Sequence, residues 1–115
     1  MTFKTIKRRP TDILFSQYLR KKIGKCQVCG KIKKLEASHF FGRRHENTRF
    51  DERNVDVLCN YDHRRFGEDP WEYCRWKEKR LGAKAIEVLA VDAFLAKERD
   101  DKMDMIKIKA LVKSL

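Results

Sequence analysis

Apolar residues at helical spacing predict a first helix over about residues 11–23. Thr11 or Asp12 can cap its start, because both side chains accept hydrogen bonds from the first backbone N–H groups of a helix. Gly24 is expected to end it. The apolar positions of this helix are Leu14, Phe15, Tyr18, Leu19 and Ile23.

Two short strands are predicted next. The first covers Leu35 to Phe41, and the second covers Val55 to Cys59, whose alternating positions and β-branched valines favour a strand. Residues 42–53 between them are largely polar and predict a loop. The pattern therefore favours a hairpin with a long connection.

A helix follows the second strand, and two starting points stay open. It begins within Asn60 to Arg65, or it is re-initiated at Asp69 as cap with Pro70 at the first helical position. Gly82 is expected to stop it. Its apolar positions, with both tryptophans interpreted as core rather than as stacking platforms for bases, are Trp71, Tyr73, Trp76 and Leu81.

The C-terminal segment predicts two more helices, over residues 83–97 and about 101–114. Asp101 can cap the second one. Its apolar stripe could pack within the chain or pair two chains into a dimer. The whole order predicts a small α+β fold. The stripe consists of Met105, Ile108, Leu111, Val112 and Leu115.

The composition suits one small domain with a modest core. Of 115 residues, 42% are hydrophobic and 39% are charged, against about 25% charged in an ordinary domain. A membrane-spanning helix needs about 18 consecutive apolar residues, and no such run occurs. No apolar signal-peptide core follows the basic N-terminus. Membrane-spanning and secreted proteins are set aside, and the cytoplasm is the expected location.

The positive charge is concentrated near the N-terminus. The chain carries 28 Lys+Arg and 17 Asp+Glu, a net charge of +11. Residues 1–34 hold eleven basic side chains and one acidic one, so a net +10 lies there, and residues 1–10 predict a basic arm. Such a block is typical of proteins that bind nucleic acid, although a solvated surface has the same composition.

The cysteines indicate a metal. Cys26 and Cys29 form a C-x-x-C pair, and Cys59 ends the second predicted strand. In a cytosolic chain this spacing favours metal or redox chemistry over a structural disulfide. Cys74 is interpreted as a small buried hydrophobic residue, because a helix would carry it roughly 18 Å along from the other three.

Three further residues stand out by their positions. His39 lies in the first predicted strand, Asn54 directly precedes the second, and His63 falls near the start of the following helix. A hairpin packed on a helix would bring all three together. Taken singly, each has an ordinary interpretation as a satisfied polar residue, a turn residue or a solvent-exposed residue.

This pattern resembles the HNH endonuclease family, also called ββα-metal or His-Me finger nucleases. The resemblance runs from about Asp12 to Gly82, and its later part is similar to the phage-encoded NinG/Rap recombination endonucleases. The segments that carry it are Leu14–Arg20, Cys26–Gly30, Ala37–His45, Thr48–Asp51, Asn54, Leu58–Cys59 with His63, Gly67–Tyr73 and Leu81–Gly82.

The resemblance implies a fold and a domain organisation. It implies a small ββα-metal, treble-clef-like HNH core over residues 11–82. The basic arm of residues 1–10 precedes that core. Residues 83–115 would form a C-terminal helical extension of the same domain.

The resemblance also implies hydrolysis of DNA phosphodiester bonds with a divalent metal ion. His39 would be the general base, whose neutral imidazole suits proton transfer near neutral pH. Asn54 would keep that imidazole in a productive orientation. His63 would bind the catalytic ion, which is Mg²⁺, Mn²⁺ or another transition metal.

Two positions depart from the family pattern. Family members often carry an acid directly before the first histidine, and this chain has Ser38, which could act only as a water-mediated ligand. Glu36 is near, but strand alternation places it on the face opposite His39. The second C-x-x-C pair of zinc-binding members is replaced here by Cys59 and, three residues later, Asp62.

A structural Zn²⁺ could therefore be held by three thiolates and one carboxylate, from Cys26, Cys29, Cys59 and Asp62. The alternative makes His63 the fourth zinc ligand instead of Asp62, and the chain a non-catalytic zinc-finger DNA-binding protein. A third interpretation leaves the cysteine knuckle without a metal.

Several basic residues are candidate contacts to the DNA backbone. They are Arg43, Arg44, His45, Arg49, Arg64 and Arg65. Arg49 could equally pin the loop internally with Phe50 and Asp51. The resemblance implies a role in recombination or DNA processing on branched or nicked DNA, in the host cytoplasm if the chain is phage-encoded. A protein-interaction module using the C-terminal helices is a further alternative.

Overall fold

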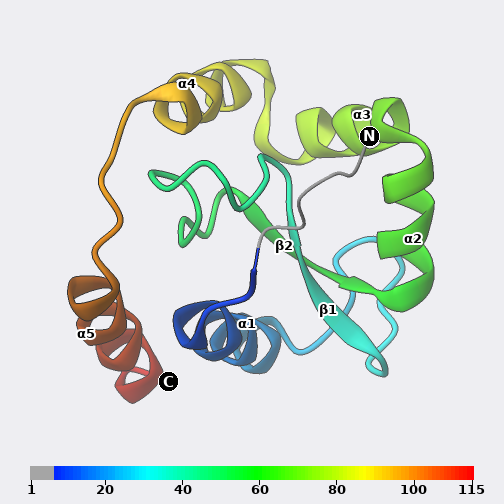
Figure 1. Ribbon diagram of the computed structural model, residues 1–115. Coiled ribbons are helices and arrows are strands. Elements are labelled where there is room, and N and C mark those ends of the chain that lie inside the picture. The colour runs from blue at the N-terminus through cyan, green and yellow to red at the C-terminus, as the bar shows by residue number, and fades with distance from the viewer. Residues whose placement is uncertain (1–6) are drawn as a thin grey trace.

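A two-stranded antiparallel sheet lies at the centre, and helices surround it (Figure 1). The computed structural model describes residues 7–115, which confirms a small α+β fold. Within that range the elements are α1 (Pro10–Ile23), β1 (Leu35–His39), β2 (Val55–Cys59), α2 (Asn60–Glu68), α3 (Pro70–Leu81), α4 (Ala83–Phe94) and α5 (Asp101–Lys113).

Helix α1 begins earlier than the sequence predicts. Pro10 occupies its first turn, where a missing N–H and a fixed φ are tolerated. The cap is Arg9, whose backbone N–H donates to Asp12 Oδ2 at 2.7 Å. The expected cap at Thr11 or Asp12 is therefore wrong, because Asp12 acts from inside the first turn. Gly24, with a φ of 72°, ends the helix as predicted.

Both predicted starting points after β2 are used. Helix α2 begins at Asn60, and α3 begins at Pro70 with Asp69 Oδ1 accepting a hydrogen bond from the Glu72 N–H at 3.1 Å. Strand β1 is two residues shorter than predicted, ending at His39. At the other end, Asp100 caps α5 instead of Asp101.

The sheet separates two packed layers. Leu35 pairs with Cys59 and His39 with Val55, so odd-numbered residues of both strands share one face. That face packs against α1 and, through Ile108, against α5. Its core consists of Phe15, Tyr18, Leu19, Val55, Val57 and Ile108. The long-range packing of α5 on α1 joins the C-terminal extension to this core.

The second core lies between the sheet, α2 and α3. It consists of Cys26, Leu58, Cys59, Phe66 and Tyr73, with Trp76 packed against it. Trp71 is 75% exposed, so its expected core position is wrong. Cys74 is exposed as well, and not the buried hydrophobic residue expected. Both lie in α3 on positions that turn away from Tyr73.

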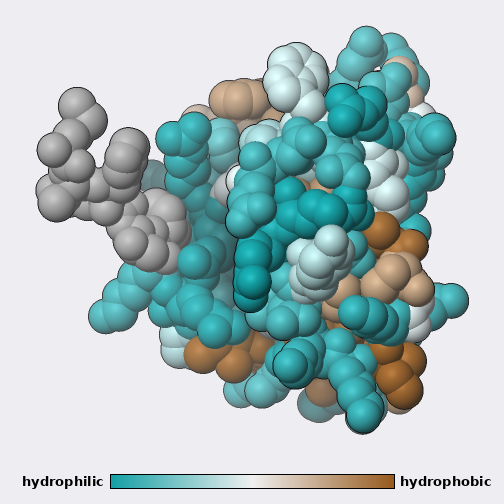
Figure 2. Space-filling model, turned by 90° about the vertical axis from the view of Figure 1, so that its right-hand side faces the viewer, coloured by the Kyte–Doolittle hydropathy of each residue, from teal (hydrophilic) through white to brown (hydrophobic). Residues whose placement is uncertain are grey.

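Hydrophilic side chains cover most of the side of the molecule that carries α2 (Figure 2). In the C-terminal stripe Ile108 is buried and Met105 and Leu111 are half-buried, whereas Val112 and Leu115 are exposed. No helix in residues 7–115 is long and apolar enough to cross a membrane. Most of the predicted basic arm lies outside the described residues.

Candidate metal centre and histidine cavity

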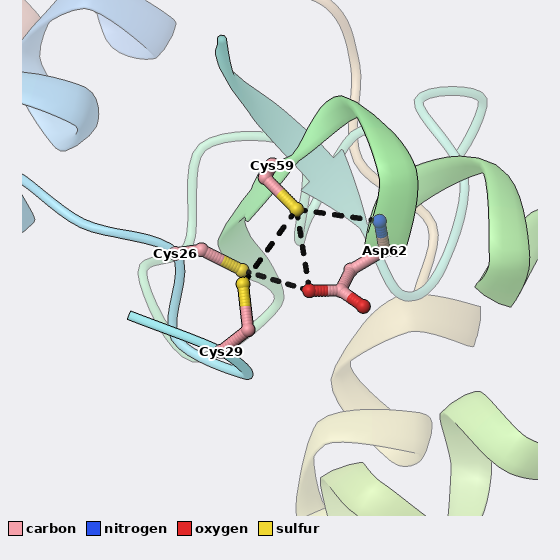
Figure 3. Close-up of side chains that lie close together, drawn as sticks. All are labelled: Cys26, Cys29, Cys59 and Asp62. Atoms are coloured by element: carbon pink, nitrogen blue, oxygen red, sulfur yellow. Dashed lines mark hydrogen bonds between the residues drawn. The ribbon is translucent and has the colours of Figure 1, made fainter. Parts of the chain in front are cut away.

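Four side chains from three parts of the chain converge at one end of β2 (Figure 3). Cys26 and Cys29 come from the turn after α1, Cys59 is the last residue of β2, and Asp62 lies in the first turn of α2. The turn is held by hydrogen bonds from the Cys26 N–H to the Lys31 carbonyl at 2.7 Å and from the Gly30 N–H to the Cys26 carbonyl at 2.9 Å. The backbone therefore fixes the C-x-x-C pair next to the strand end.

The distances in this cluster suit a tetrahedral ion. One donor atom from each of the four residues lies within 4.8 Å of the others. Asp62 Oδ2 lies 3.2 Å from the Sγ atoms of both Cys26 and Cys59, and the Sγ atoms of Cys29 and Cys59 lie 3.8 Å apart. A tetrahedral site with Zn–S bonds of about 2.3 Å has S···S edges of about 3.8 Å. The four residues could therefore bind a metal ion.

Both oxygens of the Asp62 carboxylate have partners that fix its orientation. Its backbone N–H donates to Cys59 Sγ at 3.4 Å, and its Oδ2 faces the sulfurs. Its Oδ1 accepts a hydrogen bond from Arg65 Nη2 at 3.1 Å, and Arg65 also pairs with Glu72. Such an outer hydrogen bond orients a ligating carboxylate.

The four donor groups affect one another's ionisation. Burial raises the pKa of Asp62, but the neighbouring thiols and Arg65 outweigh burial and lower it. Burial also raises the pKa of Cys26, and backbone N–H groups outweigh burial and lower it. The Lys31 backbone N–H lowers the pKa of Cys29, but the hydrogen bond to Asp62 and burial raise it to about 11. Full ionisation of the set therefore needs a cation to balance its charge.

A separate cavity of about 680 Å³ opens between α1, β1 and the start of α2. Both His39 and His63 line it, so the structure brings these two predicted residues to one space. The residues that line it are Arg8, Asp12, Phe15, Ser16, Arg20, Leu35, Glu36, Ala37, His39, Gly42, Arg43 and His63. Three arginines at its wall make it attractive to an anion.

His39 is held by the loop between the strands. Its Nε2 lies 2.9 Å from the Arg49 carbonyl oxygen. A carbonyl only accepts, so Nε2 carries the proton and Nδ1 keeps the lone pair. Burial lowers the pKa of His39 below its usual value near 6.5, although the contact with the Arg49 carbonyl opposes that shift. The geometry therefore favours a neutral imidazole.

Asn54 acts on the loop rather than on the imidazole. It is fully buried, and its Oδ1 accepts from the Phe41 N–H at 2.8 Å. Its Nδ2 donates to the carbonyls of Phe41 at 2.9 Å and Thr48 at 3.1 Å. Because Thr48 adjoins Arg49, whose carbonyl holds His39, Asn54 fixes the histidine through the backbone.

Arg49 is an internal loop anchor. It is 1% exposed, and its Nη2 lies 2.5 Å from Asp12 Oδ2, which ties the loop to α1. The same guanidinium donates to the Arg43 carbonyl at 2.8 Å. Its predicted contact with DNA is therefore wrong, because a buried guanidinium with these partners cannot reach a phosphate. The alternative of an internal anchor is the correct one, with Asp12 as partner rather than Asp51.

Ser38 does not face the cavity. It is buried on the other side of β1, where its Oγ lies 3.0 Å from the Tyr73 hydroxyl. Strand alternation places it opposite His39, so its proposed role at the catalytic ion is wrong. Glu36 shares that alternation, yet its side chain lines the cavity, because α2 lies against β1 and brings His63 within 2.9 Å of Glu36 Oε1.

The remaining predicted DNA contacts differ in their surroundings. Arg43 lines the cavity, and Arg64 lines a smaller adjoining hollow of about 300 Å³. Arg44 is exposed beside His45. His45 Nδ1 lies 3.1 Å from the Ala93 carbonyl, so that ring ties the loop to α4. Arg65 pairs with Asp62 of the cysteine–aspartate cluster.

Part of the cavity wall was not predicted from the sequence. From the sequence, Arg8 and Arg20 were expected only to add to the positive charge near the N-terminus, and Asp12 only to cap a helix. A signal for α1 was present, because Asp12, Ser16 and Arg20 recur every four residues and so share one helix face. Nothing in the local pattern pointed to Glu36.

Comparison of the chain with protein-family models, with curated proteins and with solved structures finds no match in any of the three. The function is therefore inferred from the cysteine–aspartate cluster and the histidine cavity themselves.

Proposed function

We propose that the chain is a metal-dependent DNA endonuclease of the HNH type, with β1, β2 and α2 as its ββα-metal core. The observation that carries the proposal is that His39 and His63 line one arginine-walled cavity while Asp62, and not His63, completes the cysteine cluster. The two histidines are thus available for chemistry that the cluster does not use.

His39 has the properties that a general base needs. Its Nδ1 keeps a lone pair, and its lowered pKa keeps the ring neutral near neutral pH. In the proposed reaction Nδ1 takes a proton from the water that attacks phosphorus, and the P–O bond to the leaving oxygen breaks. Asn54 and Arg49 hold this ring through the loop backbone.

His63 provides a nitrogen ligand for a divalent ion. In this proposal His63 supplies one imidazole nitrogen, and the scissile phosphate and water complete the coordination of Mg²⁺, Mn²⁺ or another transition metal. Bound there, the ion would supply positive charge to the phosphate and the leaving oxygen. The cysteine cluster would hold a structural Zn²⁺, since closed sites of thiolates and one further ligand stabilise small folds.

The proposed substrate is DNA. Arg8, Arg20 and Arg43 line the cavity, and Arg64 lies in the adjoining hollow. These cations suit phosphate contacts, which carry little sequence information, so sequence preference should be low. The resemblance to phage recombination endonucleases adds branched or nicked DNA, and a phage-encoded role in recombination or DNA processing, to the proposal.

The zinc-finger alternative is less well supported. It needs His63 as the fourth ligand of the cluster, whereas His63 Nδ1 contacts Glu36 and its ring lines the cavity. Asp62 Oδ2 already lies 3.2 Å from two of the sulfurs. A finger of this kind would also leave the held and neutral His39 without a purpose.

Relaxation of supercoiled plasmid tests the proposal. Wild type is expected to nick or linearise DNA with Mg²⁺ or Mn²⁺ and to stop with EDTA. His39→Ala is expected to lose about 10²–10⁴-fold in rate, with DNA binding within a few-fold of wild type.

Lys84→Ala is the matched control, since Lys84 is exposed on α4, outside the residues that line the cavity. Full cleavage by a folded His39→Ala chain would reject His39 as the base and the HNH assignment with it.

A further inference from the structure

Glu36 and His63 form a strand–helix pair at the cavity. Glu36 lies in β1 and His63 in the first turns of α2, and Glu36 Oε1 is 2.9 Å from His63 Nδ1. Both side chains line the cavity that also contains His39. They line the adjoining hollow as well, so the pair sits where the two spaces meet.

The chemistry of this contact fixes the tautomer of the ring. A carboxylate only accepts hydrogen bonds, so the His63 Nδ1 carries the proton that the contact uses. In the neutral imidazole the lone pair is then on Nε2. Histidines that bind metals commonly donate their other ring N–H to a carboxylate in this way, which orients the ring and makes it a better ligand.

We propose that Glu36 is the positioning carboxylate of the catalytic metal site, which holds His63 with its proton on Nδ1 and its Nε2 ready for a divalent ion. This rests on the proposed function. It gives the site an acidic residue at a place other than position 38, where the serine is buried against Tyr73. The carboxylate acts through His63 and not on the substrate.

A merely structural pair would behave differently. The side chains of His63 and Glu36 are 40% and 50% exposed, and ion pairs that exposed contribute little to folding. Loss of Glu36 should therefore leave the melting temperature close to wild type. An effect on metal binding would not follow from a structural role.

The test uses the zinc-loaded chain in a His39→Ala background, bound to a duplex oligonucleotide, so that metal binding is measured without cleavage. Binding of Mn²⁺ is titrated for Glu36→Ala and Glu36→Gln. Glu68→Gln, an exposed glutamate at the end of α2, is the matched control. Nitrogen-15 NMR of the metal-free cavity reports the His63 tautomer under mildly alkaline conditions.

Glu36→Ala is expected to weaken Mn²⁺ binding by about 10–100-fold and to shift His63 towards the tautomer protonated on Nε2. Glu36→Gln keeps an acceptor oxygen, so its loss should be smaller and its tautomer that of wild type. Glu68→Gln should match the background in both measurements.

Unchanged Mn²⁺ binding in Glu36→Ala would overturn the inference. A loss in Glu36→Gln as large as in Glu36→Ala would also overturn it, because the carboxylate would then be a ligand itself. The proposed function is judged separately, in the chain with His39 intact. Mn²⁺ binding that depends on Glu36 without any cleavage of DNA would reject the nuclease and keep the metal site.

Discussion

The two faces of the β1–β2 hairpin, whose strands have five residues each, are built in opposite ways. On the face toward α3, Lys77 Nζ lies 2.7 Å from Asp56 Oδ1, and the Tyr73 hydroxyl donates to Asp56 Oδ2 at 2.7 Å. Ser38 Oγ joins this network through Tyr73. All four side chains are buried, and each has a partner.

The face toward α1 is open at one end. Toward the hairpin loop it holds His39 beside the cavity, with arginines around it. Its apolar part, around Val57, is closed by α1. Within residues 7–115, Nδ1 of His39 has no hydrogen-bond partner, whereas both carboxylate oxygens of Asp56 have one. The buried network around Asp56 therefore serves the packing of α3 on the sheet, and we expect His39, beside the cavity, to be available for chemistry.

The cysteine cluster lies where the two faces meet, so its disruption should cause the largest loss of stability. It fixes the start of α2, which carries His63 to the cavity and Phe66 to the second core. Structural Zn²⁺ binds finger peptides with an apparent free energy of about 10–16 kcal/mol. Asp62→Ala should therefore lower zinc content and melting temperature, whereas His63→Ala should keep both and lose cleavage.

Elemental analysis and melting curves on the two variants check this. The zinc-finger alternative expects the reverse pattern, with His63→Ala losing zinc. An Asp62→Ala chain with full zinc content and an unchanged melting temperature would remove Asp62 from the site. Absence of zinc from freshly purified wild type would mean that the knuckle stands without a metal.

Disrupting the buried Asp56–Lys77 pair on the face toward α3 should give the next largest loss of stability. Burial raises the pKa of Asp56 and lowers that of Lys77, so each charge depends on its partner. Asp56→Asn removes the partner of a buried ammonium and should cost about 3–5 kcal/mol of unfolding free energy. Urea unfolding measures it.

The double variant Asp56→Leu with Lys77→Met is the control, since replacing both members of a buried pair by apolar residues is often close to neutral. If Asp56→Asn proves as stable as wild type, the network does not stabilise the packing of α3 on the sheet.

The smallest expected effect is on the pH dependence of cleavage, which tests the role of His39 on the face toward α1. A general base works in its neutral form, so activity should fall as pH drops through the pKa of His39. Burial lowers that pKa, and the acidic limb of kcat/KM should therefore be centred below the usual histidine value near 6.5. Saturating Mn²⁺ keeps the affinity for the metal ion from setting the limb. A midpoint above that value would contradict a buried base.

Local chemistry allowed the sequence to predict most elements. Alternation placed β2 at Val55–Cys59, and Asp69 with Pro70 marked the start of α3, since caps and strand periods depend on neighbouring residues. The misplaced cap of α1 also has a local cause, because Asp12 can accept from the residue three positions before it.

The cysteine–aspartate cluster was predictable for a similar reason. A C-x-x-C turn brings two thiols together by itself, and Asp62 follows Cys59 by one helical turn. Only the approach of the C-x-x-C turn to Cys59 and Asp62 depended on the tertiary structure. The cavity was predictable in part, since His39 and His63 were expected together, but its arginines from α1 were not.

Three features were decided by the tertiary structure alone. Arg49 is buried because Asp12, far away in the sequence, lies beside it. Glu36 reaches His63 because α2 returns along β1. Helix α5 covers α1 through Ile108. Each depends on contacts between segments more than twenty residues apart, and local propensity carries no information on which distant partner will balance a charge or cover an apolar face.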